Sequence, residues 1–90
     1  MMKIDIGAAE LRHDPEDGYV GQVRFRVEGH PQEYEITLFS EKGKAWDYGL
    51  HFAAESGSEA HIDEVEAFLE EDDDAFDALV QAALDAGNKG

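Results

Sequence analysis

Residues 19–39 read YVGQVRFRVEGHPQEYEITLF, and this stretch decides the fold class. Apolar and polar side chains alternate on both sides of a Gly-His-Pro turn, which is the two-residue period of half-buried strands. We therefore predict two antiparallel strands joined by a four-residue loop at 29–32. The predicted opposing pairs are Val27 with Tyr34, Phe25 with Ile36, Val23 with Leu38 and Arg26 with Glu35, followed in the next hairpin by Leu38 with Tyr48 and Ile36 with Leu50.

The same alternation continues on both sides of this hairpin. An earlier strand begins at Ile4 and ends at Leu11, and the parity of its apolar residues changes at Gly7-Ala8, which predicts a β-bulge. The Asp-Pro-Glu-Asp-Gly sequence at 14–18 is typical of a turn. A fourth strand alternates over 46–54. The inner face of the predicted sheet comprises Val23, Phe25, Ile36, Leu38, Leu50 and Phe52.

Beyond Ser56 the apolar spacing changes to the period of a helix. Ser56 with Glu59 fits a capping box, and Ser58 is an alternative N-cap. Asp72 would fall on the apolar stripe of one continuous helix, and aspartate is itself a good N-cap. We therefore favour two helices with a break near Asp72 over one long helix. Gly87 suits the C-cap position.

These elements predict a single small α+β domain. We expect a four-stranded antiparallel β-meander at 1–55, one or two C-terminal helices packed on one sheet face at 59–86, and a frayed tail at 87–90. The chain has 90 residues, of which 42% are hydrophobic, and this is enough for one core. It has no cysteine, which excludes disulfides and thiolate chemistry. No signal peptide or membrane-length apolar run is visible, so we expect a cytoplasmic location.

The most unusual feature of the sequence is its negative charge. Seven Lys and Arg stand against 22 Asp and Glu, and the net charge is −15. This charge argues against direct binding of nucleic acid or of an anionic membrane. Residues 59–90 carry −10 of it, and residues 1–58 carry −5. The densest acids form a predicted partner-binding surface, which we name the acidic face: Glu66, Glu70, Glu71, Asp72, Asp73, Asp74 and Asp77.

Patterns for catalysis and metal binding are weak. No serine lies in a nucleophile elbow, and solvent-facing carboxylates lack the burial that acid–base catalysis needs, so no catalytic residue is assigned. His61 with Asp63 and Glu64 forms a small cluster that is better explained as an exposed first helical turn. We therefore expect a protein that is not an enzyme and uses neither a metal nor a cofactor. A carboxylate-based hydrolase is the outlying alternative.

The function that these patterns favour is binding or regulation. Carboxylates along a helix can imitate phosphates and steer a basic partner, such as a nucleic-acid-binding protein or a nuclease held by an inhibitor or immunity-type protein. The alternative is a housekeeping domain whose acidity serves solubility or salt tolerance. A second interface, through which two copies could form a homodimer, is expected on the outer sheet face at Val20, Arg24, Arg26, Phe39 and His51.

Overall fold

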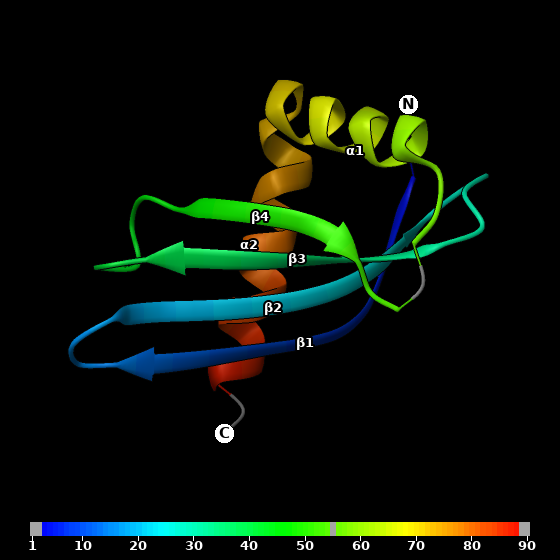
Figure 1. Cartoon of the computed structure of the whole chain (residues 1–90). Coiled ribbons are helices and arrows are strands. Elements are labelled where there is room, and N and C mark those ends of the chain that lie inside the picture. Colours follow the sequence, from blue (N-terminus) through cyan, green and yellow to red (C-terminus); the bar gives the residue numbers. More distant parts are fainter. Residues whose placement is uncertain (1–2, 55, 89–90) are drawn as a thin grey trace.

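The computed structural model describes residues 3–54 and 56–88, which form a four-stranded antiparallel sheet followed by two helices (Figure 1). The elements are β1 (Ile4–Asp14), β2 (Gly18–Val27), β3 (Glu33–Ser40), β4 (Asp47–Phe52), α1 (Glu59–Glu71) and α2 (Asp73–Asn88). The strands lie in chain order β1-β2-β3-β4, so the sheet is a meander. The predicted α+β fold class is confirmed.

Two of the three strand pairings follow the sequence prediction. β1 pairs with β2, and its register shifts between Ile6 and Ala9, at the predicted bulge. The turn after β1 is closed by the Asp14 carboxylate, which accepts a hydrogen bond from the Glu16 amide at 2.8 Å. β3 and β4 pair in the predicted register. The predicted bulge in β1 and the predicted β3–β4 register are therefore confirmed.

The predicted register of β2 and β3 is wrong by two residues. Phe25 lies opposite Tyr34 and not opposite Ile36. A shift of two residues keeps every side chain on its own face, so the alternation of the sequence cannot detect it. The connecting segment, residues 28–32, is one residue longer than predicted. It opens with a turn in which the His30 amide donates a hydrogen bond to the Val27 carbonyl at 3.0 Å. The observed pairs are Gly21 with Leu38, Val23 with Ile36, Phe25 with Tyr34, Arg24 with Glu35 and Arg26 with Glu33.

The two helices meet at Asp72, as predicted. The Ser58 hydroxyl accepts a hydrogen bond from the His61 amide at 3.3 Å, so Ser58 and not Ser56 is the N-cap of α1. Asp72 ends α1, and its carboxylate accepts a hydrogen bond from the Ala75 amide at 3.2 Å, which caps the first turn of α2. Neither described helix has the length and apolar character that crossing a membrane requires.

Gly87 lies inside α2 and is not the predicted C-cap. It permits a close approach to the sheet, because a Cβ atom at this position would lie 2.7 Å from Cδ2 of Leu11 on β1. Gly21 on β2 has a similar role, since its Cβ atom would lie 3.0 Å from the Cβ atom of Ala83. α2 therefore packs directly on β1 and β2. Residues 89–90 of the predicted tail lie outside the described residues.

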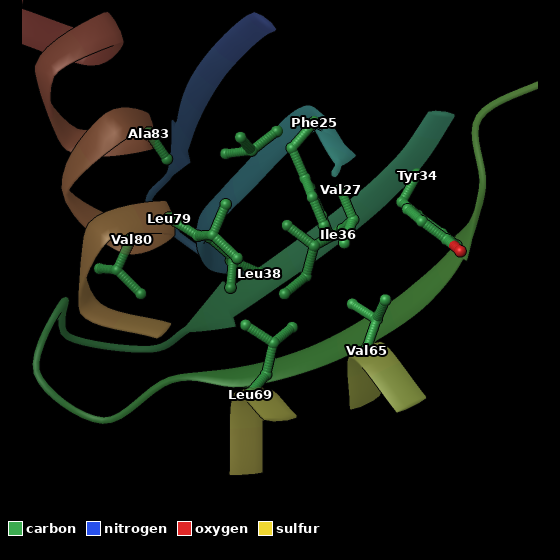
Figure 2. Close-up of a cluster of buried hydrophobic side chains, with 11 residues drawn as sticks. Phe25, Val27, Tyr34, Ile36, Leu38, Val65, Leu69, Leu79, Val80 and Ala83 are labelled. Carbon is green, nitrogen blue, oxygen red and sulfur yellow. The ribbon is translucent and has the colours of Figure 1, made fainter. Parts of the chain in front are cut away.

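The core lies between one face of the sheet and the two helices (Figure 2). Phe25 and Tyr34 have no exposed surface, and their ring centroids are 5.7 Å apart. The predicted inner-face residues of β4, Leu50 and Phe52, are half-buried, because β4 is an edge strand. The buried cluster consists of Val23, Phe25, Val27, Tyr34, Ile36, Leu38, Val65, Leu69, Leu79, Val80 and Ala83.

Candidate functional site

The acidic face lies where α1 passes into α2 (Figure 1, yellow to orange). Six of its seven residues are exposed, and Asp72 is half-buried because its carboxylate caps α2. Glu66 and Glu70 lie one turn apart on α1, and Asp73 and Asp77 lie one turn apart on α2. The structure therefore gathers the predicted residues around one helix junction and does not spread them along a single helix.

Apolar surface lies among these acids. A shallow depression of about 540 Å³ at the junction is lined by residues 71–74 together with the half-buried ring of Phe68. On the side that faces β4, the Glu70 carboxylate accepts a hydrogen bond from the Tyr48 hydroxyl at 3.3 Å. The acidic face is thus a mixed surface in which carboxylates border aromatic rings, and aromatic residues are enriched in protein–protein interfaces.

Tyr48 lies next to two glutamates of the acidic face. Burial is the largest cause that raises the pKa of Tyr48, and the negative charges of Glu70 and Glu66 raise it further. The ion pairs found in residues 3–54 and 56–88 lie elsewhere, on the outer sheet face and between His30 and Glu64. Within this part of the chain, the negative charge of the acidic face is not compensated by a paired cation.

Some of this charge opposes the stability of the helices. Glu70 and Glu71 occupy the last turn of α1, which contains no basic residue, and the C-terminus of a helix carries partial negative charge. Asp73 and Asp74 occupy the first turn of α2, where negative charge is favourable. Stabilisation of the helices therefore explains the two aspartates but not the two glutamates.

On the outer sheet face, by contrast, charges are paired. The Glu35 carboxylate accepts a hydrogen bond from Arg24 Nε at 3.1 Å and one from His51 Nε2 at 2.7 Å. The hydrogen bond from His51 is the largest cause that lowers the pKa of Glu35; burial opposes it, and Arg24 acts with it. Cross-strand pairing thus accounts for two of the predicted interface residues. The other three are the exposed Arg26 and Phe39 and the half-buried Val20, which lies opposite Phe39.

The structure also shows a histidine cluster that sequence reasoning missed. His30 and His61 stack with ring centroids 4.3 Å apart, so His61 is half-buried and not exposed as expected. His30 Nδ1 lies 2.8 Å from the Tyr34 hydroxyl, and His30 Nε2 lies 3.5 Å from Glu64. These contacts join the β2–β3 connection to α1. They could not be predicted from the spacing of residues in the sequence, because the two segments are distant along the chain. No three His, Asp or Glu side chains in residues 3–54 and 56–88 are grouped to hold a metal ion.

Comparison of the chain with protein-family models, curated proteins and solved structures finds no match. Its function is therefore inferred from its own residues. Of the two candidate surfaces, the acidic face has the larger unpaired charge in the described residues, because Glu35 pairs with both Arg24 and His51 on the outer sheet face.

Proposed function

We propose that this chain is a cytoplasmic, non-enzymatic binding protein that captures a basic protein through its acidic face. The observation that carries the proposal is the set of exposed carboxylates around one helix junction, which have no paired cation in residues 3–54 and 56–88. Complementary charge raises association rates from about 10⁵–10⁶ to as much as about 10⁸–10⁹ M⁻¹ s⁻¹ at low salt. Such a surface is therefore suited to fast capture.

The partner that fits best is a protein that itself binds phosphates. A nucleic-acid-binding protein or a nuclease presents Lys and Arg to a row of phosphates, and the carboxylates of the acidic face offer a similar row of charge. By covering that surface, the chain would act as an inhibitor or immunity-type protein. Glu71 supports a dedicated site, because acidity that served solubility alone would not need to weaken the end of α1. Glu70 weakens the same end, although its hydrogen bond with Tyr48 gives it a role in the fold as well.

The exposure of these carboxylates supports binding over catalysis. Acid–base chemistry needs carboxyl groups whose surroundings differ in burial, and six of the seven lie at the surface. The alternative function is a housekeeping domain whose acidity serves solubility or salt tolerance. The two functions differ in one respect: only capture of a partner depends on where the acids lie.

The experiment compares two variants with the same net charge. In the acidic-face variant, four acids become amides: Glu70→Gln, Glu71→Gln, Asp73→Asn and Asp74→Asn. In the control variant, four exposed acids of the sheet half become amides: Glu10→Gln, Glu16→Gln, Asp17→Asn and Glu41→Gln. Proteins are captured from native cell extract on the wild-type chain at low salt, and their association rates with all three chains are then measured by stopped-flow fluorescence.

We expect the acidic-face variant to associate about tenfold or more slowly at low salt. The effect should disappear near 1 M salt, where the Debye length falls to about 3 Å. The control variant should lose much less. Equal losses in the two variants would show that net charge alone matters, and failure of the wild-type chain to capture any protein at low salt would favour the housekeeping alternative.

A further inference from the structure

One corner of the inner sheet face is not covered by the helices. Ile4 and Ile6 belong to this face, because they lie opposite the buried residues Val27 and Phe25. Ile6 is nevertheless 38% exposed. The other exposed large hydrophobic residue of the described chain, Phe39, lies on the outer face. Exposure of an isoleucine on the face that forms the core shows that the helix layer is incomplete at this corner.

The uncovered corner forms an apolar groove of about 380 Å³ between β1 and the helix junction. Ile4 and Ile6 line it from β1, and Phe68 lines it from α1. Ala75 and Ala78, one turn apart on α2, form the remaining apolar wall. Because these two side chains are only methyl groups, the groove stays open along α2.

Two carboxylates of the acidic face border the same groove. Asp72 and Asp74 line it together with the apolar residues, so unpaired negative charge and uncovered apolar surface lie side by side. Protein interfaces commonly seat an anchor side chain in a central pocket and surround it with a polar rim. The chemistry that complements this groove is therefore an apolar side chain next to Lys or Arg.

We propose that the groove binds one large apolar side chain of the basic partner, while neighbouring Lys or Arg side chains reach Asp72 and Asp74. This inference rests on the proposed function and adds an anchor to it. Charge alone attracts any basic protein, whereas a shaped apolar contact selects among basic proteins. A second copy of this chain is a poor occupant, because it brings its own net charge of −15 to the contact.

Two substitutions alter the groove without altering charge. Ile6→Ser removes part of its apolar floor, and Ala78→Leu fills it. Ala78 is exposed and leucine is a good helix former, so Ala78→Leu keeps the test valid if Ile6→Ser folds poorly. Asp72→Asn with Asp74→Asn removes the charge at the edge, and asparagine still caps α2. Phe39→Ser makes the matched change on the outer sheet face.

The probe is a library of random 12-residue peptides displayed on phage and selected on the full-length chain at low salt. Enriched peptides are synthesised, their Kd is measured by fluorescence anisotropy, and their site is located from the amide NMR shifts of Ile6, Ala75 and Ala78. We expect peptides with Leu, Ile, Phe or Trp beside Lys or Arg. Ile6→Ser and Ala78→Leu should each weaken them about tenfold or more, and the paired Asp→Asn change should weaken them at low salt.

Other results would overturn the inference in distinguishable ways. Basic peptides whose Kd is unchanged by Ile6→Ser and Ala78→Leu would contradict the groove as their binding site but would leave the proposed function intact. Enrichment of uncharged apolar peptides whose binding is abolished by Ala78→Leu would contradict a basic partner. Failure to enrich any peptide would contradict both the groove as a binding site and the basic partner. A larger loss with Phe39→Ser would move the anchor to the outer face. A dimer in sedimentation experiments that Ala78→Leu dissociates would identify a second copy as the occupant.

Discussion

The outer sheet face and the acidic face both carry carboxylates, but only the outer sheet face pairs its carboxylate with cationic partners in the described residues. On the sheet, Glu35 is held between His51 and Arg24, and its pKa is lowered. At the helix junction, burial and the carboxylates beside Tyr48 raise the pKa of that tyrosine. Charge that is matched within the chain stabilises the fold, whereas unmatched charge is available to another molecule.

Both surfaces depend on one core. Strand β3 directs Glu35 outward and Ile36 inward, and Ile36 belongs to the same buried cluster as Val65 of α1 and Leu79 of α2. A change in the core should therefore disable both surfaces together. A substitution on either surface should affect that surface alone, so the outer sheet face and the acidic face can be compared by mutation.

The largest effect is expected from a phenylalanine on the inner face compared with one on the outer face. Phe25 has no exposed surface, whereas Phe39 is 47% exposed. Phe25→Ala should lower the free energy of unfolding by about 3–5 kcal/mol, and Phe39→Ala should change it by no more than about 0.5 kcal/mol. Urea denaturation followed by circular dichroism and Trp46 fluorescence measures both. Similar losses would contradict the assignment of the two faces.

Much of this fold was predictable, because side-chain period and cap chemistry are local properties. The alternation over residues 19–39 predicts which side chains lie on each face of the sheet. Asp72 predicts the helix break, because aspartate is a good N-cap and its carboxylate caps α2. The register of β2 and β3 was not predictable in this way. It is accompanied by contacts such as the packing of Phe25 on Tyr34 and the position of Glu35 among three strands.

The candidate site divides in the same way. The run of acids at 70–74 is visible in the sequence because it is a matter of composition. The groove beside it depends on how far α2 covers Ile6, and the stacking of His30 on His61 depends on how the chain brings distant segments together. Neither has a local signal, so both required the structure.

A smaller effect should distinguish the two sides of the helix junction. Glu70→Gln with Glu71→Gln removes charge that opposes the dipole of α1, while an amide oxygen at position 70 can still accept the hydrogen bond of the Tyr48 hydroxyl. The double change should therefore raise the free energy of unfolding by about 0.3–1 kcal/mol. Asp73→Asn with Asp74→Asn should give no such gain, because the loss of a favourable dipole interaction offsets the relief of repulsion. Urea titrations at low salt and at 1 M salt measure the difference, which screening should reduce. Equal stabilisation by both pairs would show that repulsion alone governs the junction.

The smallest effect concerns the paired carboxylate of the outer sheet face. Because the pKa of Glu35 is lowered in the folded chain, its stabilisation is present above the ordinary glutamate value of about 4.3 and is lost as the pH falls through the folded value. Glu35→Gln removes this contribution at neutral pH and should cost about 0.2–1 kcal/mol. Urea titrations of both chains between about pH 7 and about pH 3 measure the difference.

The difference between wild type and Glu35→Gln should shrink as the pH falls below about 4.3 and through the folded value, because a protonated Glu35 can no longer bind its partners as a carboxylate. Glu41→Gln is the matched control: Glu41 is exposed, and its variant should follow the wild-type curve throughout. Comparing variants separates Glu35 from the many other acids, whose protonation alters all three chains alike. If the difference stays constant down to about pH 3, pairing of Glu35 does not stabilise the sheet. The charge on the outer face would then be no better matched than the charge on the acidic face.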